Sequence, residues 1–137
     1  MPVWICATCA NHYPEAPSPP GACIICADER QWVPATGQRW TTAEELAAAG
    51  HRGDVREVEP GLLGIGVAPP VAIGQRALLV RTAEGNLLWD PPGYLDEVAV
   101  RAVAGAGGLR AVTASHPHFY GSMAGWSRAF DADVLVP

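Results

Sequence analysis

The chain has 137 residues, of which 49% are hydrophobic and 17% are charged. This balance favours a packed globular core over a disordered chain. Nine Lys and Arg against fourteen Asp and Glu give a net charge of -5, which argues against nucleic acid as a partner, because phosphate binding needs clustered positive charge. The longest uncharged stretch, residues 61–75, is broken by Pro69 and Pro70. We therefore expect neither a membrane span nor a membrane partner.

The length fits one ordinary domain, or a small stapled module followed by a short α/β domain. The first residues lack the basic and long apolar regions of a signal peptide. Closely paired cysteines without a secretion signal favour metal binding in a reducing compartment over disulfides. The sequence therefore predicts a cytoplasmic location.

Two CxxC pairs are the strongest motif in the chain. Cys6 and Cys9 form the first pair, and Cys23 and Cys26 form the second. Two tight turns of this kind present four sulfurs at tetrahedral corners, for which zinc is the default metal. The proline-rich stretch between the pairs can hardly form a helix or a central strand. It therefore needs a cross-link, such as a metal site, to hold it in one conformation. We expect one structural zinc in a knuckle over residues 1–35.

Two alternatives to a zinc site remain for the four cysteines: they are unpaired buried thiols or redox-active CxxC motifs, or they bind iron. The same four thiolates also hold iron in a rubredoxin-like centre, whose function is one-electron transfer. His12 lies between the two pairs. Because four cysteines fill the ligand shell, His12 is interpreted as a solvated loop residue.

The rest of the chain predicts a linker and then an α/β domain. In residues 36–59, Thr42 to Glu45 has capping-box form and Gly50 is placed to end a short helix. From residue 60, apolar periodicity predicts strands at 62–68, 76–82, 87–90, 109–115 and 133–136, with helices over 95–105 and after Ser122. This order implies an α/β (α+β layered) fold with a mixed sheet covered by helices.

A pair of histidines lies where a predicted buried strand gives way to a helix, the edge at which open α/β sheets bind ligands. His116 and His118 are two residues apart on this turn, so both can point at one metal ion. With a third ligand and an open position, a second zinc there would lower the pKa of a water molecule, and zinc-bound hydroxide would attack a substrate. Loop or packing histidines are the alternative. Asp90, before Pro91, is either a support for this site or a plain turn residue.

These segments together resemble the first half of the metallo-β-lactamase superfamily, over roughly residues 60–137. In that family an aspartate ending an early strand supports the metal site, and Asp90 matches its position. His116 and His118 match the first two histidines of the family's HxHxDH motif. Residues 74–80 and 115–130 are also similar to a bacterial subgroup that carries an N-terminal cysteine knuckle. The resemblance implies half of an αβ/βα fold and a metal-dependent hydrolase.

The chain departs from the family motif at two positions. Tyr120 and Gly121 stand where the family has the aspartate and the third histidine, and the family's later ligands would lie beyond residue 137. Tyr120 is either a distant ligand, a hydrogen-bond donor to substrate, or an aromatic packed over the loop. A non-catalytic, zinc-stabilised binding or scaffold module is therefore the alternative to a hydrolase.

The hydrolase reading implies a small-molecule substrate, which fold-level resemblance does not identify. Half of a two-sheet fold also implies an apolar sheet face without its usual cover, at 78–80 and 87–89. At about 25 cal/mol per Å², a bare face of several hundred Å² costs on the order of 10 kcal/mol. We expect a second copy of the chain or a partner chain to cover this face, unless the fold is rearranged to close its own core.

Overall fold

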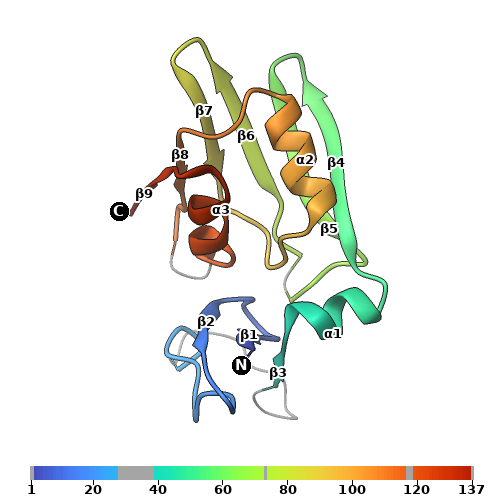
Figure 1. Ribbon diagram of the computed structural model, residues 1–137, viewed down its shortest axis with the longest axis vertical. Helices are drawn as coiled ribbons and strands as arrows, with labels where there is room; N and C mark the ends of the chain where they lie inside the picture. Colours follow the sequence, from blue (N-terminus) through green and yellow to red (C-terminus); the bar gives the residue numbers. More distant parts are fainter. Residues whose placement is uncertain (1, 28–38, 73, 117–118, 137) are drawn as a thin grey trace.

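The computed structural model describes residues 2–27, 39–72, 74–116 and 119–136. It contains two sheets, a small N-terminal one and a larger one, with helix α1 beside the junction between them (Figure 1). In chain order the elements are β1 (Val3–Cys6), β2 (His12–Glu15), β3 (Trp40–Thr41), α1 (Ala43–Ala48), β4 (Arg52–Glu59), β5 (Leu62–Ala68), β6 (Ala77–Thr82), β7 (Gly85–Trp89), α2 (Glu97–Gly105), β8 (Ala111–Thr113), α3 (Met123–Phe130) and β9 (Asp133–Leu135).

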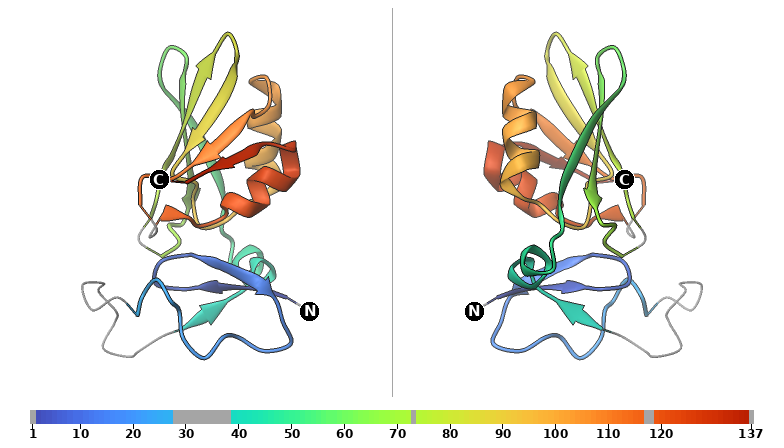
Figure 2. Two further views of the ribbon diagram at one scale, coloured as in Figure 1. Left: turned by 90° about the vertical axis from the view of Figure 1, so that its left-hand side faces the viewer. Right: turned by 90° about the vertical axis from the view of Figure 1, so that its right-hand side faces the viewer.

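The larger sheet has six strands in the order β4-β5-β6-β7-β8-β9. Strands β4 to β7 form an antiparallel meander, and β7, β8 and β9 run parallel. Parallel neighbours need crossover connections, which α2 and α3 supply. Both helices lie on the same side of the sheet (Figure 2). The prediction of a mixed sheet covered by helices, in an α/β (α+β layered) fold, is confirmed.

The smaller sheet has the order β2-β1-β3, with both pairings antiparallel. Cys6 at the end of β1 pairs with Trp40 in β3. Residues 36–59 were predicted to be a linker with one short helix, and this is wrong at both ends. Strand β3 belongs to the small sheet, and β4 forms an edge of the large one. Most side chains of β4 are exposed, so this edge strand lacks the apolar alternation that reveals a strand in sequence.

The helix starts follow local capping chemistry in two of the three cases. Thr42 caps α1 as predicted, since its side chain accepts a hydrogen bond from the Glu45 N–H at 3.2 Å. Asp96 caps α2 and also accepts a hydrogen bond from the Gly53 N–H, which ties the helix to β4. Ser122 precedes α3, as predicted, but its hydroxyl donates to the carbonyl oxygen of Pro92 at 2.7 Å instead of capping.

The main core lies between the six-stranded sheet and the two helices that cover it. Its fully buried large side chains include Ile65, Leu79, Leu88, Val112 and Trp126. A second buried cluster joins the small sheet, α1 and the loops of the larger domain, and consists of Ile5, Ala10, Leu46, Val71 and Tyr94. The two parts of the chain therefore share one continuous set of packed residues.

The other side of the six-stranded sheet is covered by no helix that the structure describes (Figure 2). We call this side the open face. Its side chains alternate with the core residues along the strands and pair in register across them. The set comprises Leu62, Leu78, Val80, Leu87 and Trp89. The first four are partly buried and Trp89 is 44% exposed.

Within the described ranges, no helix has both the length and the apolar character that crossing a bilayer requires.

Candidate functional site

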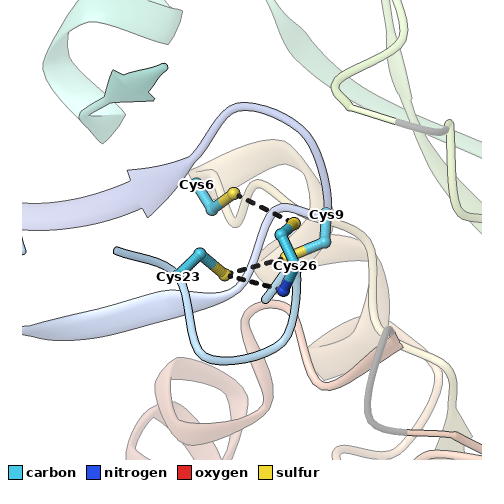
Figure 3. Close-up of side chains that lie close together, drawn as sticks. All are labelled: Cys6, Cys9, Cys23 and Cys26. Atoms are coloured by element: carbon cyan, nitrogen blue, oxygen red, sulfur yellow. Dashed lines mark hydrogen bonds between the residues drawn. The ribbon is translucent and has the colours of Figure 1, made fainter. Parts of the chain in front are cut away.

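The four cysteines predicted to bind metal lie together in the small N-terminal sheet and its loops. Their sulfur atoms all lie within 4.8 Å of one another (Figure 3). The sulfurs of Cys6 and Cys26, and those of Cys9 and Cys23, are 3.7 Å apart. Zinc–sulfur bonds of about 2.3 Å place tetrahedral sulfurs about 3.8 Å from one another. The cluster therefore has the size and donor set of a four-thiolate metal site.

The two CxxC turns are built by backbone hydrogen bonds. The Ala10 N–H donates to the carbonyl of Cys6 at 2.8 Å, and the Ala27 N–H donates to that of Cys23 at 2.9 Å. Ala10 has a positive φ of 65°, a strained conformation for a residue with a Cβ atom. All four cysteines are buried and none forms a disulfide. The thiols are thus held together by the turns, as a metal site requires.

The protonation of the thiols is coupled. The hydrogen bond with Cys9 lowers the pKa of the Cys6 thiol to about 5, although burial acts in the opposite direction. The same contact raises the pKa of the Cys9 thiol, and burial adds to this increase. One sulfur of the pair therefore ionises readily while the other retains its proton. A bound divalent cation replaces such a proton and stabilises both thiolates.

Tyr13 supports the cluster from strand β2. Its hydroxyl donates to the Cys23 sulfur at 3.1 Å and accepts from the Ile24 N–H at 2.9 Å. Burial and the contact with Cys23 raise the pKa of Tyr13 to about 12, so the phenol keeps the proton that it donates. The ring also packs edge-on against Trp40, with centroids 5.3 Å apart. No motif in the sequence marked Tyr13.

The second candidate site lies at the carboxyl ends of β7 and β8, where Asp90 follows β7. Its carboxylate accepts hydrogen bonds from the Ser115 N–H at 2.7 Å and from the Ser115 hydroxyl at 3.0 Å. The Asp90 backbone has a φ of 58° and its N–H donates to the Thr113 carbonyl. A non-glycine residue in this region costs about 1–3 kcal/mol and persists only when its surroundings impose it. Asp90 thus fixes the start of the histidine loop.

The structure describes one of the two predicted histidine ligands. His116 is exposed, its carbonyl accepts from the Phe119 N–H, and its ring meets that of Phe119 edge-on at 6.4 Å. His118 lies outside the described residues, so the prediction that it shares one ion with His116 stays a prediction. Among the residues that the structure does describe, neither Asp90 nor His116 belongs to a group of three or more potential metal ligands.

The two positions that depart from the family motif have structural explanations. Tyr120 is partly buried and packs against the main core, which matches the aromatic-packing reading. Gly121 has a φ of 42°, and a Cβ atom there would lie 3.0 Å from the Pro91 carbonyl oxygen and 3.1 Å from that of Pro92. A histidine at position 121 would therefore displace this backbone.

A cavity of about 220 Å³ lies next to Asp90 on the open face, and Arg76, Leu78, Trp89, Asp90 and Ser115 line it. No pattern in the sequence identified Arg76 as part of a site.

His12 does not lie in a solvated loop. It is partly buried in β2, and its Nε2 lies 2.9 Å from the carbonyl oxygen of Gly93. Its interpretation as a solvated loop residue is wrong, because the small sheet packs against the larger domain at this point.

The chain has a relative of similar sequence among known proteins. No protein-family model matches the chain. The chain is similar to a protein of Bacillus subtilis (strain 168) named "Uncharacterized protein YmaE", with 37% identity over 137 residues, or 99% of this chain. The chain spans 50% of that relative's length. The similarity thus covers both the cysteine module and the six-stranded sheet, within a protein about twice as long.

Proposed function

We propose that this protein is a metal-dependent hydrolase of the metallo-β-lactamase type, to which a four-cysteine module holding structural zinc is fused. The resemblance at Asp90, His116 and His118 suggests the class. A mixed sheet with both helices on one side, and an open apolar side opposite, agrees with half of a two-sheet fold. The substrate is a small molecule with a bond that activated water can break.

The observation that carries this proposal is the contact between Asp90 and Ser115. Asp90 holds a left-handed backbone and uses its carboxylate to fix both the N–H and the hydroxyl of Ser115. Ser115 precedes His116 directly, so the aspartate orients the start of the loop that carries both histidines. Strain held at a strand end in this way is typical of functional sites. A divalent metal held by the histidines would lower the pKa of a water molecule and so supply the nucleophile.

At the cysteines, we propose zinc and a structural role. Sulfur spacings of 3.7 Å suit a closed four-thiolate shell, and zinc is the metal that such shells most often hold. Because all four positions are filled by sulfur, no open position remains for substrate. Iron in the same shell would give rubredoxin-like electron transfer. Visible absorbance of the purified protein separates the two, since zinc thiolates are colourless and ferric thiolates are red.

Metal stoichiometry tests the hydrolase proposal. We expect two metal ions per chain, one lost in Cys6→Ser and the other lost in His116→Ala. Asp90→Asn should weaken the second ion and leave the first unchanged. Hydrolysis of chromogenic lactam, thioester and phosphodiester substrates should then fall in His116→Ala. A single ion per chain that His116→Ala does not remove would overturn the proposal.

The second candidate is a non-catalytic, zinc-stabilised binding module. The packing at positions 120 and 121 favours it, because Tyr120 contacts the core and Gly121 fits closely against Pro91 and Pro92. Neither position then offers a metal ligand. In this case the chain binds one zinc at the cysteines, and the residues around Asp90 serve only to order the loop.

We further propose a polypeptide partner for the open face. Its row of side chains, from Leu62 to Trp89, is apolar and in register, whereas Leu79 and Leu88 on the opposite side of the same strands are fully buried. The chain spans half of its relative's length, so the occupant that we propose is a second layer equivalent to the unmatched part of that relative. That part, added as a separate polypeptide, should bind and shift the Trp89 fluorescence to the blue. Failure to bind, or a dimer of this chain alone, would contradict the proposal.

A further inference from the structure

The cysteine module contacts the larger domain through the segment that follows Asp90. A Cβ atom built on Gly93 would lie only 2.1 Å from the Cβ atom of Ala10, so only glycine permits this approach. Because a carbonyl oxygen can only accept, His12 donates its Nε2 proton to Gly93, over 2.9 Å. Ala10 and His12 come one and three residues after Cys9 in the sequence. The first CxxC turn and the Gly93 backbone are therefore in direct contact.

Two further contacts hold the same turn against the domain. The Gln75 side-chain amide donates to the backbone carbonyl of Cys9 at 2.8 Å, and both residues are buried. Tyr94, the neighbour of Gly93, packs with Ile5 and Ala10 in the second core cluster. The backbone of a metal-ligand cysteine is thus bonded to the larger domain, next to the segment that leads back to Asp90.

The segment from Pro91 to Gly93, which we call the strut, reaches the candidate site at its other end. Pro91 and Pro92 are fully buried, and each proline ring fixes its φ angle, which makes the segment stiff. The Pro92 carbonyl accepts from the Ser122 hydroxyl at 2.7 Å, and Gly121 lies against the same backbone. The strut therefore touches the cysteine module on one side and the chain after the histidine loop on the other.

We propose that the four-cysteine metal centre positions the candidate site through the strut. Closure of the Cys6–Cys9 turn by a bound metal fixes Ala10 and His12, these fix Gly93, and the strut then fixes Asp90 and residues 119–122. His12 and Gly93 are positioning residues in this scheme, and neither touches a reacting group. The importance of the coupling for catalysis rests on the proposed function, but the coupling itself is a property of the fold.

Amide hydrogen exchange of the zinc-loaded chain, read by mass spectrometry, tests the coupling without any substrate. The variants are His12→Ala, which removes one hydrogen bond, and Gly93→Ala, which forces Ala10 away. The control is Gly66→Ala, because a Cβ atom there meets nothing within 4 Å. With the cysteine-bound zinc retained, His12→Ala should speed exchange at residues 93–95 and 119–122 about fivefold, the factor that the loss of one hydrogen bond gives. The control should match the wild type.

Zinc removal provides the second arm of the test. In the wild type, a chelator should speed exchange at residues 93–95 and 119–122 while the central strands β6 and β7 stay protected. In the His12→Ala, Gly93→Ala double variant, the chelator should add nothing further at 119–122. If the zinc-loaded variants exchange at the wild-type rate in both segments, the proposal is overturned. This arm of the test remains valid even if chelation unfolds the whole chain. The proposed function depends on the second metal ion. It is tested by the metal stoichiometry, independently of these amide exchange rates.

Discussion

The two sheets of this protein are held together by different means. The six-stranded sheet encloses a continuous apolar core, in which Leu79, Leu88 and Trp126 are fully buried. The small sheet has three short strands, and its centre consists of four cysteines with Tyr13, Ile25 and Trp40 packed around them. Apolar burial accounts for the first, whereas we propose that the second depends on bonds between its four sulfur atoms and a metal ion. The two parts should therefore respond to different perturbations.

The largest effect that we expect is on metal removal from the small sheet. Structural zinc in small modules supplies on the order of 10 kcal/mol of folding free energy, more than the few apolar contacts of this sheet can replace. Cys9→Ser should abolish metal retention at this cluster and expose residues 2–27 to limited proteolysis. The larger domain should keep its protected core strands. A Cys9→Ser protein whose N-terminal segment resists protease as the wild type does would contradict the comparison.

Shortening a side chain in the main core should destabilise the larger domain and leave the metal content at the cysteines unchanged. Leu88→Ala removes a fully buried side chain from a central strand, so it should lower the free energy of unfolding by about 2–5 kcal/mol without changing the metal content at the cysteines. Its neighbour Leu87 points to the open face and is partly buried, so Leu87→Ala should cost less. Denaturant titration with metal analysis measures both. Equal losses in the two variants would mean that the open face is packed in solution.

A smaller effect is expected at the strained aspartate. Asp90→Ala removes the acceptor for both Ser115 donors and leaves an alanine at a φ of 58°. The unfolding free energy should fall by about 1–3 kcal/mol. Ser115→Ala, the matched control, removes the hydroxyl but keeps the backbone N–H, so it should lose less. If thermal unfolding of Asp90→Ala equals that of the wild type, Asp90 is a plain turn residue.

The smallest effect concerns pH. Burial lowers the pKa of His12 below its ordinary value, so the folded state binds fewer protons than the unfolded state. Its contribution to stability is complete above the unfolded pKa of about 6.5 and is lost as the pH falls from there towards the folded pKa. His12→Gln cannot titrate and should lose less stability over this range. Denaturant midpoints of both proteins between pH 7.5 and 5 test this; identical pH slopes would contradict it.

Most of the larger domain could be predicted from sequence because its residues follow local rules. Apolar periodicity indicated β5 to β9, and the Thr42 cap indicated α1. Strand β4 was missed because its side chains are mostly exposed, so its pairing with β5 leaves no apolar alternation to detect. Its place in the sheet depends on long-range contacts, among them the hydrogen bond from Gly53 to Asp96.

Some features of the candidate site could also be predicted from the sequence, and others could not. The cysteine cluster could be predicted because the CxxC spacing itself builds the turns that bring the sulfurs together. The roles of His12 and Gln75 could not, since their partners, Gly93 and Cys9, lie 81 and 66 residues away along the chain. No local pattern encodes such contacts. They arise only when the two sheets pack against each other.

X-ray absorption at the zinc edge tests most directly the claim that a four-thiolate metal centre holds the small sheet together. The His116→Ala variant is the sample of choice, because it leaves the cysteines as the one predicted site. The expected result is one zinc per chain, surrounded by four sulfur atoms at about 2.3 Å. A shell containing nitrogen or oxygen in place of sulfur, or purified protein that retains no metal while residues 2–27 stay folded, would contradict the account.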